Sequence, residues 1–305
     1  MQCMVIDRFL TYIRAEKRYS ENTALNYERD IRRFFADTGI DEPDFDPQLV
    51  TADDIRSWIT SLSENGLGPA SVNRMTSSLR SFFKWLRKTG AVAKDPFLRI
   101  GSQRMPSRLP GYITEAKMDE VVLDVERGAA EDFVSQRNAL IIVLFYSTGM
   151  RLAELLDIRL NDFSDNFREL RIRGKGNKER VVPLIEYAAA KVSEYTGRIK
   201  AENICESPDN FLFLSSKGKQ VSRSEVYRAV RVELTRMGVQ GKKSPHVLRH
   251  TFATHMLNDG ADIREIQEML GHASLSATQV YTHNSISQLK EIYRGAHPRG
   301  RKKDD

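Results

Sequence analysis

The chain has 305 residues, 40% hydrophobic and 29% charged, which predicts a soluble globular protein of two domains and excludes a membrane-spanning one. Asp7 and Arg8 interrupt the first ten residues, which excludes a signal peptide, and Cys3 and Cys205 lie too far apart for a metal-ligand motif. The net charge of +6 favours a polyanionic partner without requiring one, since many basic proteins bind no nucleic acid.

The first hundred residues predict an N-terminal helical bundle, residues 1–100. Its predicted helices cover residues 4–18, 20–36, 51–66 and 70–88. Ser20 is a favourable N-cap, and Thr51-Ala52-Asp53-Asp54 resembles a capping box with Asp in place of Glu. An acidic, proline-containing loop, residues 41–47, separates the second helix from the third.

The predicted helix 70–88 has one apolar face and one basic face. The basic face consists of Arg80, Lys84, Arg87 and Lys88. A solvated polar face is the simpler interpretation of such a stripe, but no acidic residue occurs between Ala70 and Lys94, whereas soluble faces usually mix signs. The segment from Asp37 to Glu64 contains eight acidic residues and a single arginine, so charge is segregated along the chain. We therefore expect these four cations to contact the phosphates of a polyanionic partner.

Residues 101–111 contain two prolines and two arginines without periodicity, which predicts an extended basic linker. The second domain, residues 112–298, is predicted to be mainly helical with a small antiparallel sheet. The predicted helices begin at Thr114 and near 132, 152, 222, 245, 262, 274 and 286, the strands cover 169–173 and 180–183, and 211–214 could add a third strand. The apolar run 139–146 predicts a buried core helix, and the basic tail 299–305 is expected to be disordered.

Residues 244–251 (Ser-Pro-His-Val-Leu-Arg-His-Thr) predict an anion site at the start of a helix. Ser244 is a favourable N-cap and Pro245 a favourable first helical residue. At 100° per residue, His246, Arg249 and His250 fall within about 100° of one another. Their positive charge and the helix N-terminus together favour an anion over a cation.

Histidines at positions i and i+4, here His246 and His250, also have the spacing of a helical zinc site. In that motif a glutamate follows the first histidine as general base, whereas the residue here is Val247, and Arg249 would repel a cation. We therefore reject metal binding and interpret His250 as a histidine that is hydrogen-bonded within its domain.

Each remaining candidate has a simple structural explanation when it is taken alone. Arg151 can form a surface ion pair with Glu154, three residues later, and Lys175 can be an exposed lysine in a glycine turn. His272 can follow a helix C-cap by chance, and a lone tyrosine such as Tyr281 is far more often structural than catalytic.

Taken together in chain order, the candidate residues form a specific pattern. They lie in the segments Thr148-Gly149-Met150-Arg151-Leu152-Ala153-Glu154-Leu155, Gly174-Lys175-Gly176, His246-x-x-Arg249-His250, Leu270-Gly271-His272 and Gln279-Val280-Tyr281-Thr282-His283. This order closely resembles the tyrosine recombinase (phage integrase) family and, within it, the Xer recombinases of bacteria. The resemblance covers nearly the whole chain and implies a SAM-like N-terminal bundle plus a tyrosine recombinase catalytic domain. The implied active-site set is Arg151, Lys175, His246, Arg249, His272 and Tyr281.

The resemblance implies a site-specific recombinase that cuts and rejoins DNA. Arg151 and Arg249 would clamp the scissile phosphate, and His272 would donate a further hydrogen bond to it. Because two arginines supply the positive charge, we expect no metal and no cofactor.

The resemblance also assigns the proton transfers. Tyr281 would be the nucleophile and would form a 3′-phosphotyrosyl link. A phenol has a pKa of about 10 and needs a base, for which His246 is the candidate. The leaving 5′-oxygen needs a proton, for which Lys175 is the candidate acid.

The expected partner is double-stranded DNA, held by a tetramer on two synapsed sites and exchanged through a Holliday junction. The tetramer could contain one protein or include a paralogous recombinase. Segment 286–297 either packs on its own domain or forms an exchange helix that docks into a neighbouring subunit, and family habit favours docking. We expect a bacterial, cytoplasmic, nucleoid-associated protein. Its role could be chromosome dimer resolution, with a link to chromosome partition and cell division, or integration or inversion of a mobile element.

Three alternatives remain open from the sequence. A type IB-like topoisomerase would relax supercoils with a similar catalytic set. A non-catalytic DNA-binding or architectural protein would use the same basic faces without chemistry. A metal-dependent nuclease would cleave DNA only with a divalent ion bound.

Overall fold

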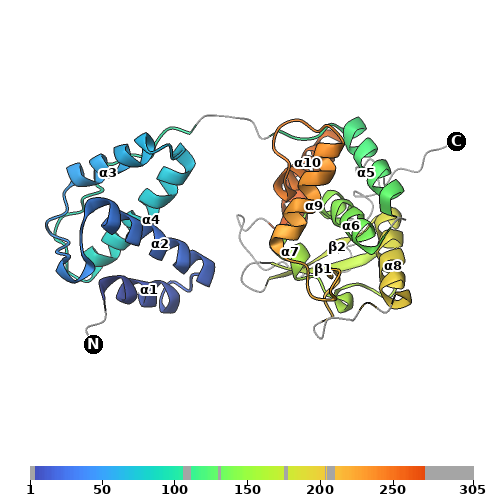
Figure 1. The fold of residues 1–305 in the computed structure, drawn as a ribbon, viewed down its shortest axis with the longest axis horizontal. Helices are drawn as coiled ribbons and strands as arrows, with labels where there is room; N and C mark the ends of the chain where they lie inside the picture. The colour runs from blue at the N-terminus through green and yellow to red at the C-terminus, as the bar shows by residue number, and fades with distance from the viewer. Residues whose placement is uncertain are drawn as a thin grey trace. The chain divides into compact units, whose positions relative to one another are not determined.

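The computed structural model describes residues 4–105, 111–129, 132–174, 178–202, 204 and 210–271. The chain divides into two compact units, Met1–Arg108 and Leu109–Asp305, each with its own hydrophobic core. Both units are mainly helical, and the second carries a small antiparallel sheet, which confirms the predicted fold class (Figure 1). Within the described ranges, no helix has the length and apolarity that crossing a membrane requires.

The first unit is a helical bundle. Its elements are α1 (Val5–Ala15), α2 (Glu21–Thr38), the short 3₁₀ helix η1 (Glu42–Asp44), α3 (Ala52–Glu64) and α4 (Pro69–Lys88). The predicted caps are present: the Ser20 side chain accepts from the N–H of Thr23, and Thr51 and Asp54 form a reciprocal capping box. The starts of α2 and α3 are therefore fixed by local side chain to backbone hydrogen bonds.

Aromatic rings fill the core of the first unit. The rings of Phe9 and Phe82 meet edge to face at 5.3 Å, and those of Phe34 and Trp58 at 5.1 Å between centroids. The predicted apolar face of α4 is buried, namely Val72, Met75, Leu79, Phe82, Phe83 and Leu86. Most of the polar side chains of α4 consequently face outward.

The chain that follows α4 folds back onto the first unit. Arg80 donates a hydrogen bond of 2.7 Å to the carbonyl of Ile100. The side chain of Asn73 exchanges two hydrogen bonds, of 2.9 and 2.7 Å, with the backbone of Gln103. The first residues of the segment 101–111 are thus bonded to the first unit.

The second unit is built around α6. Its elements are α5 (Glu115–Ala129), α6 (Phe133–Thr148), α7 (Leu152–Leu156), the 3₁₀ helix η2 (Leu160–Asp162), β1 (Glu169–Arg173), β2 (Glu179–Pro183), α8 (Glu186–Ala201), α9 (Arg223–Arg236), α10 (Pro245–Asn258) and α11 (Ile263–Leu270). Helices α5, α8, α9 and α10 all contact α6 (Figure 1). The apolar run 139–146 is buried throughout, as predicted.

The structure differs from the sequence prediction at two elements. Helix α8 has no counterpart among the predicted elements, although its buried side chains have helical spacing, namely Ala188, Val192, Tyr195 and Ile199. The third strand predicted over 211–214 is wrong, because the ends of that segment make only single bridges, to Arg159 and Gln220. Its side chains at 212–214 are buried in the core, so the apolar run reflects burial rather than sheet pairing.

The start of the second unit is fastened to α10. The N–H of Ile113 donates to Oγ1 of Thr251 at 3.0 Å, and its carbonyl accepts from Nε2 of His255 at 2.8 Å. Because a carbonyl can only accept, the His255 proton lies on Nε2, and Nδ1 accepts from the Tyr146 hydroxyl at 2.9 Å. Burial lowers the pKa of His255, in agreement with a neutral ring. Both backbone groups of Ile113 are therefore satisfied by one helix.

Replacing His255 by glutamine should weaken the dependence of stability on pH. Since the pKa of His255 is lowered in the folded state, the unfolded state binds the proton more readily, and stability falls as the pH drops below the ordinary value of 6.5. The nearby carboxylates Glu115, Asp259 and Asp119 oppose the effect of burial only in part. Glutamine keeps an N–H donor without titrating. We expect the wild-type Tm to fall a few degrees more between pH 7.5 and pH 5.5 than the Tm of H255Q.

His255→Asn serves as the control, because its shorter side chain does not reach the carbonyl of Ile113. It should lower the Tm at both pH values. Parallel pH profiles for the wild type and H255Q would rule out His255 as a neutral group with a lowered pKa.

Candidate active site

Arg151 is the N-cap of α7, two residues after the glycine that ends α6. Gly149 has a positive φ of 60°. A Cβ at this position would lie 2.4 Å from Cδ1 of Phe252 on α10 and 2.7 Å from Cδ2 of Leu270 on α11, too close for any side chain. Glycine therefore lets three helices meet here, and this contact fixes the position from which Arg151 extends.

Glu154 holds Arg151 in place. The backbone N–H and Nη1 of Arg151 each donate to the Glu154 carboxylate at 2.8 Å. Burial alone would raise the pKa of Glu154, but hydrogen bonds and positive charge from Arg180, and then hydrogen bonds from Arg151, outweigh it and lower the pKa. The pair suggested by the sequence thus forms, but its carboxylate is buried, whereas the Arg151 side chain is 37% exposed.

Arg249 lies on the buried side of α10, which starts as predicted with Ser244 at the N-cap and Pro245 as its first residue. Its Nη1 donates to the carbonyl of Gly149 at 2.6 Å, and its Nη2 to that of Leu270 at 2.8 Å. Burial, followed by the positive charge of Arg151, lowers the pKa of Arg249 to about 10. At neutral pH the guanidinium is still charged.

The two arginines meet at the end of α11. Nη2 of Arg151 donates to the carbonyl of Gly271 at 3.1 Å, directly after the carbonyl that Arg249 binds. Gly271 immediately precedes His272 in the sequence. The structure therefore brings Arg151 and Arg249 together at the residue before a third predicted member of the site.

Of the four other predicted site residues, the structure describes His246 alone. His246 is exposed in the first turn of α10, three residues before Arg249. Lys175, His272 and Tyr281 lie outside the described residues, as do the helices predicted near 274 and 286 and the tail.

A buried arginine of β2, Arg180, completes the charge cluster. It donates to both oxygens of Glu154, at 3.1 and 2.8 Å. Among the described residues, the guanidinium groups of Arg151, Arg180 and Arg249 thus lie near one carboxylate, that of Glu154. Such an excess of positive charge suits an anionic ligand. In the described part of the chain, no group of three or more metal-ligating side chains is found.

The four basic residues predicted on α4 differ in their surroundings. Lys84 and Arg87 are exposed. The Arg80 side chain already donates a hydrogen bond to the carbonyl of Ile100, and its Cζ lies 5.5 Å from the centroid of the Phe97 ring. Lys88 lies 3.1 Å from the carboxylate of Glu16. Lys84 and Arg87 are therefore better placed than the other two to meet a phosphate.

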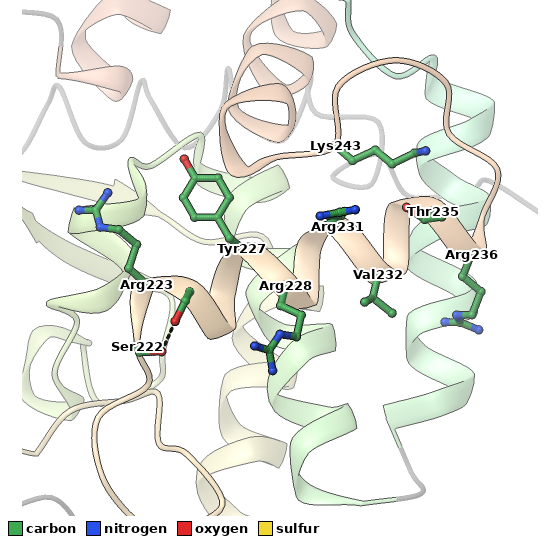
Figure 2. A pocket seen from close by; sticks show the side chains of 10 residues that line it. Ser222, Arg223, Tyr227, Arg228, Arg231, Val232, Thr235, Arg236 and Lys243 are labelled. Carbon is green, nitrogen blue, oxygen red and sulfur yellow. Dashed lines mark hydrogen bonds between the residues drawn. The ribbon is translucent and has the colours of Figure 1, made fainter.

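A second basic surface, on α9, is absent from the sequence prediction. An open groove of about 1170 Å³ follows this helix, and its cationic lining residues are Arg223, Arg228, Arg231, Arg236 and Lys243 (Figure 2). Arg236 pairs with Glu233 at 2.6 Å and Asp124 at 2.5 Å. Exposed Tyr227 and Val232 lie among the arginines. The argument that singled out α4 does not find this face, because Glu225 and Glu233 lie among the arginines of α9.

Two family models match the sequence. The "Phage integrase family" matches residues 116–288, and the "Phage integrase, N-terminal SAM-like domain" matches residues 6–90. Tyrosine recombinase XerC of Listeria innocua is 36% identical over 296 residues, covering 96% of this chain and 97% of the relative. Tyrosine recombinase XerD of Shewanella oneidensis is 33% identical over 296 residues, covering 97% of both.

Solved structures with the same fold include two DNA complexes. The XerH site-specific recombinase bound to difH substrate, a pre-cleavage complex, has a TM-score of 0.68 at 19% identity, covering 97% of this chain and 83% of that one. A lambda integrase (75-356) dimer bound to a COC′ core site has a TM-score of 0.66 at 18% identity, covering 91% and 98%. At these identities the likeness concerns the fold.

Inorganic phosphate should stabilise the protein through the arginine cluster. Burial and then the charge of Arg151 lower the pKa of Arg249, and an anion between the two arginines offsets both effects. At constant ionic strength, phosphate at its dissociation constant should raise the wild-type Tm by about 1–2 °C, and higher concentrations should raise it further. R151Q should lose most of this shift.

R168Q is the matched control, because Arg168 is a surface arginine of the same unit that pairs with Glu186 at 3.0 Å. It should keep the full shift. The same phosphate effect in R151Q and the wild type would show that the anion binds elsewhere. Thermal denaturation over a phosphate series measures all three proteins.

Proposed function

This chain belongs to the phage integrase family, and from that premise we propose that it is a site-specific DNA recombinase. Tyrosine recombinases cleave and rejoin DNA through a covalent tyrosine intermediate. The observation that carries the proposal is the convergence of Arg151 and Arg249 on successive carbonyls directly before His272. Two arginines from distant parts of the chain thus meet at one helix end, as a clamp on a single phosphate requires.

The arginine pair acts as the phosphate clamp. A DNA phosphodiester is an anion, so it repels a nucleophile until its charge is offset. Arg151 and Arg249 offer planar N–H groups that match phosphate oxygens, and His272 adds a further donor. The hydrogen bonds from these donors strengthen most in the transition state, where negative charge builds up on the non-bridging oxygens. The clamp supplies the positive charge that divalent metals supply in other phosphoryl transfers, so the mechanism calls for neither metal nor cofactor.

Cleavage is a displacement at phosphorus. The phenolic oxygen of Tyr281 forms a bond to phosphorus as the bond from phosphorus to O5′ breaks, and His246 accepts the phenolic proton. Lys175 gives a proton to the departing O5′. The products are a 3′-phosphotyrosyl link and a free 5′-hydroxyl, so the energy of the phosphodiester is kept. A 5′-hydroxyl from another duplex reverses the step and exchanges strands without ATP.

Both units contribute to DNA binding in this proposal. Residues 1–100 form the core-DNA-binding domain, 101–111 the linker and 112–298 the catalytic domain. In the first domain, Lys84 and Arg87 contact the phosphates of the DNA backbone. In the second, the basic face of α9 follows the duplex beside the scissile phosphate. The exposed ring of Tyr227 among those arginines also suits contact with sugar and base edges.

We further propose a tetramer on two synapsed sites, made of one protein or of this chain and a paralogous recombinase. Segment 286–297 would dock into the neighbouring subunit and couple the active sites. The protein would act on nucleoid DNA in the bacterial cytoplasm. Chromosome dimer resolution suits the Xer-type relatives, and integration or inversion of a mobile element is the alternative role.

Substituting Tyr281 by phenylalanine should abolish covalent attachment to DNA while leaving DNA binding intact, because only the nucleophilic oxygen is lost. Wild-type protein incubated with fragmented genomic DNA should yield a denaturant-resistant adduct. Sequencing the DNA end attached to Tyr281 identifies the cleavage site. Y281F should bind the same duplex with unchanged affinity and give no adduct.

The same assay separates the alternative functions. An architectural protein would form no adduct in either variant. A topoisomerase would efficiently relax supercoiled plasmid that lacks the mapped site, and a metal-dependent nuclease would lose cleavage in EDTA. The recombinase proposal requires an adduct in EDTA, little relaxation of such a plasmid, and strand joining between two mapped sites.

Removing charge from α9 should weaken binding to DNA and lower its salt dependence. R231Q loses one contact, so the slope of log K against log salt concentration on a random 30-base-pair duplex should fall by about 0.9 for each phosphate released. R228Q/R231Q should lower it by about twice that amount.

R198Q provides the matched control, since Arg198 on α8 pairs with Glu202 at 2.5 Å in the same unit. Its slope should equal that of the wild type. If R231Q and R198Q behave alike in a fluorescence anisotropy titration, α9 does not contact the backbone.

A further inference from the structure

Arg180 is a buried cation that the proposed chemistry does not use. Its side chain is 6% exposed, on the inward side of β2. Removing a guanidinium from water is unfavourable unless its hydrogen bonds are well formed, and an apolar residue of similar volume often serves stability equally well. The partners of Arg180 therefore show what its presence achieves.

Those partners lie on two other elements. Nε donates to the carbonyl of Met269 at the end of α11, at 2.7 Å. Nη1 and Nη2 donate to the two carboxylate oxygens of Glu154 on α7. Glu154 in turn accepts two hydrogen bonds from Arg151, so a single carboxylate joins the buried arginine to the phosphate clamp. One planar group thereby links β2, α7 and α11.

The same guanidinium lies against two glycines. A Cβ on Gly271 would be 3.1 Å from Nη1 of Arg180, and a Cβ on Gly174 would be 3.9 Å from that atom. Gly271 immediately precedes His272, and Gly174 immediately precedes Lys175. The backbone leading to each of these residues thus passes beside Arg180.

We propose that Arg180 is a positioning residue for DNA cleavage. It fixes Arg151 through Glu154 and holds the backbone at Gly174 and Gly271 in register with it. The proton donor and the phosphate donors are thereby aligned on one phosphodiester. The inference rests on the proposed recombinase function and adds a buried residue that acts through Glu154 and the backbone at Gly174 and Gly271.

A simple structural role is the alternative explanation. A buried ion pair that only holds the fold together would affect stability and DNA binding, and would slow cleavage of every substrate to the same degree. A positioning role predicts a defect that depends on the leaving group, because alignment of the proton donor matters only when the leaving group needs a proton.

The test uses the DNA site mapped through Tyr281, in two forms. One duplex has an ordinary phosphodiester, and the other has sulfur in place of the bridging O5′. When the bond from phosphorus to sulfur breaks, the electron pair leaves on a thiolate, which needs no proton because the pKa of a thiol is only about 8.5. R180K keeps the charge but lacks the planar fork that reaches both Glu154 and Met269.

We expect R180K to form the adduct about 100-fold more slowly than the wild type on the ordinary duplex, with unchanged DNA affinity. On the sulfur duplex, the ratio of the wild-type rate to the R180K rate should be at least tenfold smaller. R173K is the control: Arg173 lies in the neighbouring strand of the same hairpin and pairs with Asp162 at 2.6 Å, but its side chain is 42% exposed. It should cleave both duplexes at the wild-type rate.

A second variant decides the question should R180K fail to fold. Gly271→Ala inserts a Cβ against Arg180, whereas Gly238→Ala adds one at a similar φ, +68° against +63°, with no atom within 4 Å. Both carry the same backbone strain. Only G271A should slow cleavage and recover in part on the sulfur duplex.

Equal losses on both duplexes, or an R180K rate within threefold of the wild type, would overturn the positioning role. If R180K does not fold, equal losses of G271A on both duplexes, or a G271A rate within threefold of the wild type, would overturn it. Failure of the wild type to form any adduct would instead overturn the recombinase function and this inference with it. The two failures are thus distinguishable.

Discussion

The buried carboxylate of Glu154 is the interaction on which the candidate site depends. It accepts hydrogen bonds from Arg151 on its own helix and from Arg180 on β2, so one anion orients two cations. Without it, two guanidinium groups would repel each other in a region shielded from water, where electrostatic forces are strong. The position of Arg151 is thus set by a charge balance as well as by the start of α7.

Among the described residues, the single negative charge of Glu154 does not balance the positive charge of the arginines around it, which suits an anionic ligand. Arg249 adds a third guanidinium, and burial together with the nearby Arg151 lowers its pKa to about 10. The cluster therefore carries excess positive charge that costs folding free energy and that a bound phosphate would offset. Sites that bind or stabilise charge commonly sacrifice stability in this way. The close packing around Gly149 supplies the rigidity that such an arrangement needs.

Helix α10 connects the site to the rest of the second unit. Its first turns carry His246 and Arg249, and its later turns bind both backbone groups of Ile113 through Thr251 and His255. The segment entering this unit is therefore bonded to the same helix that carries Arg249 of the proposed phosphate clamp. The basic face of α9 lies on the element before it in the chain, and Lys243 in the connecting loop extends that surface towards the start of α10 (Figure 2).

The sequence alone determined the local features, because caps and periodicity depend on neighbours a few residues apart. It predicted the capping box at Thr51, the buried stripe of α4 and the core helix α6, and the order of its motifs indicated the family. Helix α8 escaped detection although its spacing was visible, and the strand expected at 211–214 was wrong because burial and pairing give the same apolar run. The tertiary structure alone placed Arg180 beside Glu154 and Met269. Which side of β2 faces inward depends on hairpin register and on a helix end 89 residues away, and no local pattern encodes that meeting.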